Sequence, residues 1–298
     1  MAEPLMMEEI VEEILLHLPP DDPASLLRAA AVCKQWCRVI CAPGFRRRFA
    51  QRHLSAPMLG FLAYTIRKDE RGRYCSVTRF VPTTTFRPPR TEHRYRRAVD
   101  ARHGRVLLTD APELNVLEVW DPVTDELRQL SPPAGPPPIN WNAAVVCAAH
   151  GACGHQDCRR GPFLVVLLDG DAANIPLISL NDPVVLTTTG DSRLGFARVE
   201  GTQLCLWLVE THPEGGVVLS HVRSIELETL LLIDGFPIEY CCLNFAHGAG
   251  VIYVRTLRAW FSIDLKSNQV KEEECVVGRN IAAIPYMSLY TPGVLQTR

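Results

Sequence analysis

The residues best suited to chemistry are five potential metal ligands crowded into twelve consecutive positions of the sequence. They follow the pattern Cys-x2-His-x2-Cys-x-His-x2-Cys, at Cys147, His150, Cys153, His155 and Cys158. Thiol and imidazole groups in this number would satisfy a tetrahedral zinc ion. The spacings differ, however, from the paired Cys-x2-Cys knuckles of zinc fingers, and an apolar run borders Cys147. We therefore favour a solvated loop between strands, and we expect no metal and no other cofactor.

Other signatures of catalysis are missing from the sequence. It has no Gly-x-Ser-x-Gly nucleophile elbow, and no cysteine–histidine pair stands in an activating context. The glycines of segment 248–250 lack the lysine and the strand–loop–helix pattern of a phosphate loop. Cys241 and Cys242 lie in an apolar segment, where vicinal thiols more often pack than carry out redox chemistry. These observations predict a protein without enzymatic activity.

Composition sets the class of protein and its surroundings. Of the 298 residues 47% are hydrophobic and 21% charged, and the net charge of −2 favours neither nucleic acid nor an anionic membrane as a partner. The apolar runs, such as residues 163–168, are far shorter than the roughly 20 residues of a membrane span. Eleven cysteines without a secretion signal indicate reduced thiols. We expect a soluble protein of the cytoplasm, the nucleus or both.

The first fifty residues have the pattern of three helices. In segment 8–18 apolar residues recur every four positions, glutamates occupy the other face, and Pro19-Pro20 ends the helix. Asp22 is placed as an N-cap, with Pro23 at the first position of a second helix that continues to Ile40 through a bend near Lys34. A short basic helix follows over residues 45–53. Its arginine run at 46–48 is interpreted as a solvated helix face in preference to a nucleic-acid contact.

From about residue 57 the pattern changes to short apolar runs separated by turn-forming residues, which is typical of an all-β domain. The clearest runs are 59–64, 106–108, 116–120, 163–168, 204–209 and 251–254. Segments 87–97 and 131–138, rich in proline, are expected to be exposed loops, and one further helix is conceivable over 224–232.

A weak internal repeat links residues 119–127 to residues 262–270. In each copy a strand runs into an aspartate, Asp121 or Asp264, and a turn then leads to a second strand. The copies are 143 positions apart, which is about three blades at the ~40–50 residues of a propeller repeat. The repeat favours successive β-meanders over a single sandwich.

The N-terminal segment resembles an F-box. The resemblance covers residues 4–49 and rests on Leu18-Pro19 at the end of the first helix and on the Val-Cys-Lys-x-Trp motif at residues 32–36. Pro4-Leu5-Met6-Met7 stands where F-boxes commonly open with Leu-Pro. The remainder resembles the grass F-box proteins with a β-rich associated domain, on strings such as 120–124, 161–166 and 194–197. In that group the segment after a strand like 163–168 is commonly longer.

This resemblance implies a multidomain α + β protein. We expect a three-helix F-box over residues 1–55 and, over residues 56–298, a mostly β, propeller-like domain for substrate recognition. Five or six blades would fit this length. The short segment after residue 168 leaves both a complete and a shortened ring open.

The resemblance also implies a role as a non-catalytic adaptor of a cullin–RING ubiquitin ligase of the SCF type. The helices would bind a Skp-family linker, which sits on a cullin, and the β-domain would bind a target protein that the sequence does not identify. Docking is expected to use apolar residues of the helices. These are Ile14, Leu15, Leu18, Pro19, Leu26, Leu27, Val32, Cys33, Trp36 and Ile40. The alternatives are a protein- or carbohydrate-binding β-domain outside any ligase, with a degenerate F-box, and a shortened receptor that binds the linker but no target.

Overall fold

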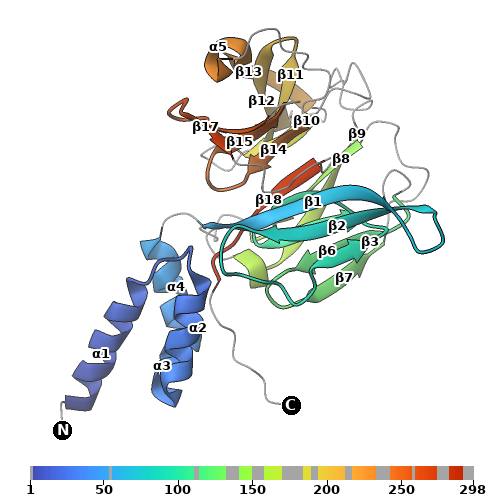
Figure 1. Cartoon of the computed structure of the whole chain (residues 1–298). Coiled ribbons are helices and arrows are strands. Elements are labelled where there is room, and N and C mark those ends of the chain that lie inside the picture. The colour runs from blue at the N-terminus through green and yellow to red at the C-terminus, as the bar shows by residue number, and fades with distance from the viewer. Residues whose placement is uncertain are drawn as a thin grey trace.

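Figure 1 shows a computed structural model of the chain, in which helices at the N-terminal end adjoin a larger domain of strands. The structure describes residues 3–53, 56–110, 114–131, 141–149, 158–169, 184–188, 194–211, 217–232, 242–256, 259–273 and 282–290.

The helical unit contains four helices, one more than the sequence predicts. They are α1 (Glu3–Leu16), α2 (Pro23–Val32), α3 (Lys34–Cys41) and α4 (Pro43–Arg52). The expected bend near Lys34 is a complete break, because Cys33 is extended, with φ −158° and ψ 164°. The Cys33 Sγ accepts a hydrogen bond of 3.5 Å from the Trp36 backbone N–H and so caps α3. A thiol can therefore take the capping place that Ser or Asp usually fills.

The core of the helical unit is built from all four helices. The side chains of Leu15, Leu26, Ile40, Phe45 and Phe49 are almost fully buried in it. Complete burial of such a side chain stabilises the fold by roughly 1.5–3 kcal/mol. This core also includes Leu289, which follows the last strand of the β-domain, so the two units share one hydrophobic cluster.

Within its described residues, the β-domain has a propeller-like arrangement of four four-stranded antiparallel sheets, with a two-stranded sheet between the second and the third. Blade 1 consists of β18 (Ala282–Met287), β1 (Met58–Lys68), β2 (Tyr74–Pro82) and β3 (Glu92–Arg94). Blade 2 consists of β4 (Arg97–Arg102), β5 (Arg105–Thr109), β6 (Leu117–Asp121) and β7 (Glu126–Leu130). Blade 3 consists of β8 (Trp141–Cys147) and β9 (Phe163–Asp169). Blade 4 consists of β10 (Val184–Thr188), β11 (Leu194–Glu200), β12 (Gln203–Thr211) and β13 (Val217–Glu226). Blade 5 consists of β14 (Cys242–Ala246), β15 (Val251–Arg255), β16 (Trp260–Asp264) and β17 (Val270–Glu273).

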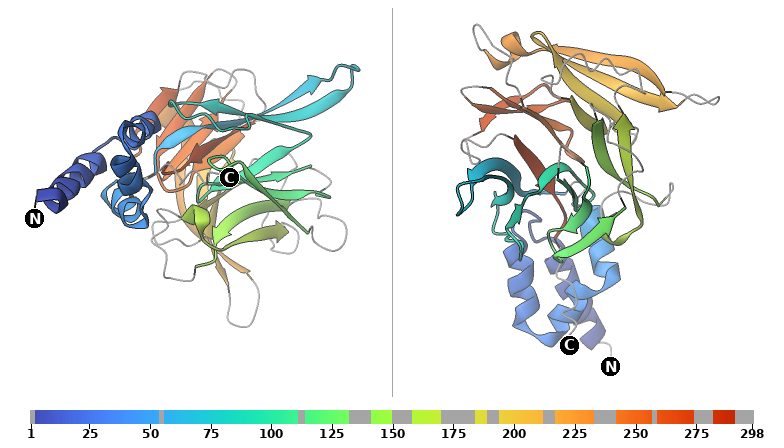
Figure 2. Two further views of the ribbon diagram at one scale, coloured as in Figure 1. Left: turned by 90° about the horizontal axis from the view of Figure 1, so that it is seen from below. Right: turned by 90° about the vertical axis from the view of Figure 1, so that its right-hand side faces the viewer.

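The first strand of each blade contacts the first strand of the next blade. The order of contacts is β18, β4, β8, β10 and β14, and β14 in turn lies against β18 (Figure 2). The ring closes because β18 pairs with β1, with Gly60 opposite Tyr286 and Leu62 opposite Ile284. Blade 1 thus joins segments from opposite ends of the described chain, a pairing that leaves fewer open sheet edges.

The apolar runs predicted as strands all lie in strands or reach one within a residue. The expected loop at 87–97 is wrong in part, because it contains β3 and the first residue of β4. Most of segment 131–138 lies outside the described residues. Segment 224–232 begins as the end of β13 and contains only the one-turn helix α5 (Leu227–Leu231).

The internal repeat is confirmed as the same turn in blades 2 and 5, three blades apart. The Asp121 carboxylate accepts hydrogen bonds of 2.8 and 3.3 Å from the backbone N–H groups of residues 123 and 124. Asp264 accepts equivalent bonds of 2.9 and 2.7 Å from residues 266 and 267. Asp125 and Asn268 then take positive φ values of 58°, which Asp and Asn tolerate better than most residues.

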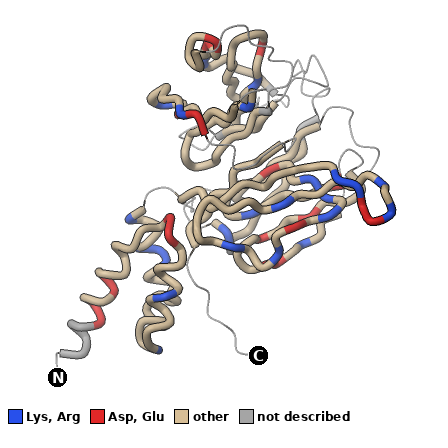
Figure 3. The backbone as a smooth tube through the Cα atoms, viewed as in Figure 1, with Lys and Arg blue, Asp and Glu red and all other residues tan. Residues whose placement is uncertain are grey.

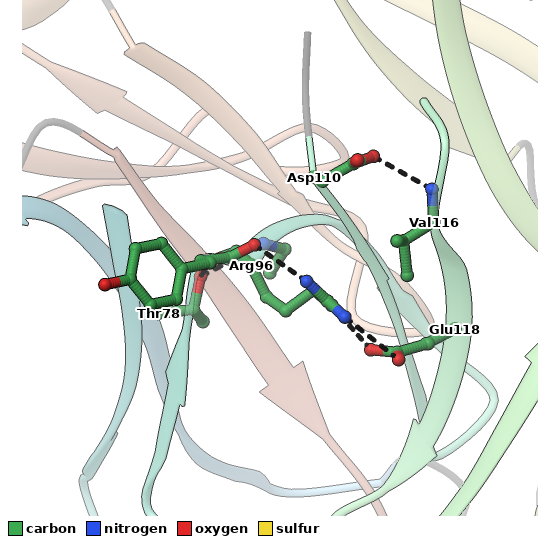
Figure 4. A network of polar contacts seen from close by, with 7 residues as sticks. Thr78, Arg96, Asp110, Val116 and Glu118 are labelled. Atoms are coloured by element: carbon green, nitrogen blue, oxygen red, sulfur yellow. Dashed lines mark hydrogen bonds and ion pairs between the residues drawn. The ribbon is translucent and has the colours of Figure 1, made fainter. Parts of the chain in front are cut away.

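Blades 1 and 2 are joined by the polar network of Figure 4. The Thr78 hydroxyl on β2 donates to the backbone carbonyl of Arg96 and accepts from the N–H of Ala98, at 2.9 and 3.1 Å. The Arg96 guanidinium forms two hydrogen bonds to the carboxylate of Glu118 on β6, at 2.8 and 3.3 Å. A hydrogen bond to Glu118 raises the pKa of Arg96. The segment that contains Arg96 is therefore bonded to blade 1 through Thr78 and to blade 2 through Glu118.

A buried ion pair lies among the first strands of the blades. The Asp100 carboxylate on β4 is 2.8 Å from the Arg102 guanidinium, and the two side chains are 6% and 1% exposed. Asp100 also accepts from the Val145 N–H on β8 at 2.8 Å, and Arg102 donates to the Leu186 carbonyl on β10 at 3.3 Å. Burial raises the pKa of the Asp100 carboxyl, and the adjacent Arg102 charge opposes that shift. One ion pair thus connects three blades.

The hairpin of β1 and β2 extends beyond the rest of blade 1 (Figure 1). β18 pairs with β1 only as far as Tyr64, and β3 pairs with β2 only from Val77 to Arg79. The distal half is therefore a two-stranded ribbon, and Figure 3 shows charged residues at its tip. Asp69 shapes that tip by accepting hydrogen bonds from the N–H groups of Arg71 and Arg73, at 2.9 and 2.8 Å.

Candidate functional site

The helical unit presents large apolar side chains to solvent on two of its helices. On α1, Ile10 and Ile14 are 57% and 59% exposed and lie one turn apart. On α2, Leu27 and Val32 are 45% and 64% exposed. Exposed apolar side chains gathered on so small a unit mark a surface suited to a protein partner.

The structure divides the ten predicted docking residues into three groups. Five are exposed: Ile14, Pro19, Leu27, Val32 and Cys33. Leu18 and Trp36 are half-buried and pack against the helical core. Leu15, Leu26 and Ile40 are buried within that core, so in this structure they position the exposed residues and present no surface of their own. The use of these residues in docking stays a prediction.

Ile10 is a candidate that the sequence reasoning missed. It lies one turn before Ile14 on α1 and is exposed to almost the same extent. The spacing of four between the two residues was visible in the sequence. This spacing predicts one face of a helix, and periodicity alone does not say whether that face is buried or exposed to solvent.

Ion pairs between α1 and α4 hold the exposed part of α1 in place. Arg48 contacts Glu12, and Arg52 lies 3.4 Å from Glu13 and also contacts His17. Figure 3 shows the acidic residues along α1. Arg48, the last residue of the predicted basic face, therefore pairs with a carboxylate on a neighbouring helix while its side chain stays 56% exposed, in agreement with a solvated helix face at this residue.

Asp22 connects the helical unit to blade 1. It occupies the predicted N-cap position of α2, but its side chain forms no capping bond to a backbone N–H. Its carboxylate instead accepts from the hydroxyls of Ser25 and Thr85, at 2.5 and 3.1 Å, and from Arg28 at 3.1 Å. The Ser25 hydrogen bond is the main cause of a lowered Asp22 pKa. Because Thr85 belongs to the segment between β2 and β3, this carboxylate supports the orientation of α2 relative to the propeller.

The predicted metal ligands lie only partly within the described residues. Cys147 is half-buried at the end of β8, and Cys158 is buried in a short 3-10 helix (Cys158–Arg160) before β9. His150, Cys153 and His155 lie outside the described residues. Within the described part of the chain, no three His, Cys, Asp or Glu side chains are grouped to hold a metal ion.

Two histidines of the β-domain are buried in an uncharged form. Desolvation, assisted by the nearby Arg90 charge, lowers the pKa of His93 to about 4, and its ring lies against Trp120 with centroids 4.3 Å apart. Desolvation likewise holds the pKa of His247 well below its usual value. His247 lies 3.6 Å from Asp100, beside the ion pair of the first strands. Both imidazole rings therefore pack inside the β-domain.

Comparison with known proteins identifies the helical unit. Residues 8–52 match the sequence model of the F-box-like family. These residues contain the last nine of the 14 residues of α1 and the whole of α2, α3 and α4, so the matched segment includes the exposed apolar residues described above. The match supports an F-box protein. A search of curated proteins found no match to the chain.

Among solved structures, one similar chain is the extracellular domain of a candidate one component system, BT4673, from B. thetaiotaomicron. It is 10% identical, with a TM-score of 0.30, over 74% of this chain and 29% of the other. The present chain therefore spans less than a third of the length of that structure. Among the described helices, none has the length and apolar character needed to cross a membrane.

Proposed function

We propose that the chain is a substrate-recognition adaptor of an SCF-type cullin–RING ubiquitin ligase. The F-box-like helices would bind a Skp-family linker, and the linker would connect the chain to the cullin. The β-domain would bind the protein to be ubiquitinated. The observation that carries the proposal is the match of residues 8–52 to the F-box-like family, on a segment that exposes Ile10, Ile14, Leu27 and Val32.

The physical character of the helical unit supports this proposal. Its core already uses Leu15, Leu26, Ile40 and the two phenylalanines of α4, so the exposed apolar residues are not needed for its own packing. Burying them against a partner would contribute about 25 cal/mol for each Å² of apolar surface removed from water. A few such anchors commonly carry most of the energy of an interface.

The remaining parts of the proposal follow from the adaptor role. F-box proteins generally act without catalysis of their own, and we propose the same for this chain. Membership of the grass group with a β-rich associated domain, a boundary between units at residues 55 and 56, and a site of action in the cytoplasm or nucleus are part of the same proposal. The propeller-like domain offers the larger surface for a target.

Binding to a purified plant Skp-family linker tests the proposal. Ile14→Asp should weaken binding by about 30-fold or more if Ile14 is an anchor of the interface, since hot-spot residues contribute at least about 2 kcal/mol. Val222→Asp is the matched control, because Val222 lies on β13 of the propeller and is 57% exposed against 59% for Ile14. The control should bind like the wild type.

The outcome distinguishes the candidate functions. Failure of the folded wild-type chain to bind any Skp-family linker would refute the adaptor role and favour a binding protein outside the ligase. Equal binding by the wild type and both variants would refute the assignment of Ile14 to the interface. Linker binding without target capture, in proximity labelling with a proteasome inhibitor present, would favour a receptor that binds no target.

A further inference from the structure

A small polar cavity lies between blades 2 and 3, away from the helical unit's exposed apolar residues. It has a volume of about 20 Å³ and includes Arg105, Asp121, Arg128, Arg159 and Phe163 in its lining. Arg105 begins β5, Asp121 ends β6, and Phe163 begins β9. Arg159 lies in the 3-10 helix between β8 and β9. Two sheets and a connecting helix therefore converge on one point.

The two central arginines of this cavity are buried. Arg105 and Arg159 are only 5% and 6% exposed. The Arg105 guanidinium lies 4.7 Å from the Phe163 ring centroid and donates one hydrogen bond of 2.5 Å to the Gly161 carbonyl. Burial lowers the pKa of Arg105, yet a guanidinium stays charged at neutral pH. Both positive charges are thus held out of bulk water.

The donors of the two guanidinium groups are incompletely used. Arg105 Nη1, Arg159 Nε and Arg159 Nη1 are all buried and have no hydrogen-bond acceptor among the described residues. Buried polar groups normally find a partner, and a charged donor left without one destabilises the fold more than a neutral donor does. Three such donors at one cavity indicate a missing acceptor.

The charges around the cavity also fail to balance. Asp121 is the carboxylate nearest Arg159, at 3.6 Å, and its Oδ1 is engaged by the backbone N–H groups of its own turn. Arg128 and Glu126 form a separate pair at 2.8 Å on the exposed side of the cavity. The lining thus holds three arginines, Arg105, Arg128 and Arg159, but only two carboxylates, Asp121 and Glu126, which leaves one positive charge without a counter-charge.

We propose that this cavity binds a small oxyanion of the phosphate or sulfate class. Guanidinium groups match the oxygens of such anions in geometry as well as charge. The unpartnered donors would each gain an acceptor, and the anion would supply the negative charge that the three arginines lack. The proposal concerns the propeller alone and does not depend on the adaptor role.

The size of the cavity defines what enters it. A cavity needs roughly 10–15 Å³ to hold one water, so about 20 Å³ receives one or two oxygen atoms of an anionic group, and the rest of the group would lie at the open mouth of the cavity. The anion can therefore be free in solution or be carried on a larger molecule. A phosphorylated peptide, its unphosphorylated form and free inorganic phosphate distinguish these sources.

The test is a titration of the full chain with inorganic phosphate or sulfate, at constant ionic strength maintained with chloride. The melting temperature should rise with the concentration of the oxyanion, because a ligand that binds only the folded state stabilises it. Arg159→Met should weaken binding by about tenfold or more, since it removes charged donors. Arg96→Met is the matched control, because Arg96 is a half-buried arginine that is paired with Glu118 and does not line the cavity. That control should bind like the wild type.

Asp121→Asn supplies an independent test in the opposite direction. The amide oxygen can still accept from the turn, whereas the negative charge that competes for Arg159 is lost, so the oxyanion should bind more tightly. No phosphate-dependent or sulfate-dependent shift in the wild type would indicate a cavity filled by water and would overturn the proposal. A shift of equal size in Arg159→Met, or weaker binding by folded Asp121→Asn, would also overturn it.

Discussion

Replacing Asp100 by Asn would test whether the buried ion pair holds the first strands of the propeller together. The change keeps the size of the side chain and an oxygen that can accept from the Val145 N–H. It removes the charge opposite Arg102, whose side chain is 1% exposed. Arg102 would then be a buried cation without a counter-ion, with one of its guanidinium nitrogens, Nη1, already lacking a hydrogen bond within the described structure.

The structure allows the size of this effect to be worked out. Breaking a buried pair by removing one partner costs about 3–5 kcal/mol. In a domain of this size each kcal/mol lowers the melting temperature by roughly 2–4 °C, so Asp100→Asn should melt about 6–20 °C below the wild type. The pair connects three blades through hydrogen bonds to Val145 and Leu186, so the loss should affect the whole ring and not a single blade.

Glu126→Gln is the control for this experiment. Glu126 and Arg128 are also two residues apart in blade 2 and also 2.8 Å apart, but their side chains are 55% and 59% exposed. An exposed pair contributes at most about 1 kcal/mol, so this variant should melt within roughly 4 °C of the wild type. Differential scanning calorimetry of the two variants gives the comparison. Equal losses would refute the argument that burial decides the strength of the pair.

Three further changes have definite expected outcomes. His93→Phe should reduce the loss of stability at acid pH. In the wild type, between pH 6.5 and about 4, His93 binds a proton in the unfolded state but not in the folded state. The free energy of unfolding of the wild type therefore falls by up to about 1.4 kcal/mol per pH unit as the pH decreases. Urea unfolding at several pH values measures this slope in the wild type and the variant. Equal slopes would contradict the conclusion that folded His93 is buried without a charge. Gly195→Ala should lower the free energy of unfolding by about 1–3 kcal/mol, because the new Cβ would lie 2.6 Å from the Trp207 carbonyl oxygen. A urea unfolding midpoint equal to or above that of the wild type would exclude the clash. Leu289→Ala should destabilise the helical unit by about 2–5 kcal/mol. Relative to the wild type, amide hydrogen exchange should then accelerate more in α1–α4 than in the blades, and an equal acceleration in both would argue against a shared core.

The helical unit shows where sequence reasoning succeeds and where it stops. The proline break and the start of α2 at Pro23 could be predicted, because proline restricts its own backbone whatever surrounds it. The division of apolar residues between core and surface could not, because it depends on which helices meet. Leu15 and Ile14 are neighbours in sequence, but Leu15 faces the core and Ile14 faces solvent.

The β-domain shows the same distinction between local and distant interactions. The turns after Asp121 and Asp264 were predictable, because each aspartate binds backbone groups two and three residues away. The strand β3 was missed, since three residues in a segment rich in proline and arginine carry no strand pattern and pair only through β2. The oxyanion cavity was also invisible to the sequence, because Arg105 and Arg159 meet only when two blades pack.

Because β18 pairs with β1, blade 1 can be completed only after nearly the whole chain has been synthesised. At ~5–20 residues per second, Gly60 leaves the ribosome roughly 10–45 seconds before Tyr286, the residue it pairs with. During that interval one edge of β1 stays available for wrong strands. Leu289, which completes the helical core, emerges only after β18. The newly made helices and the newly made ring therefore mature at nearly the same moment, and a factor that shields the β1 edge during translation would assist both.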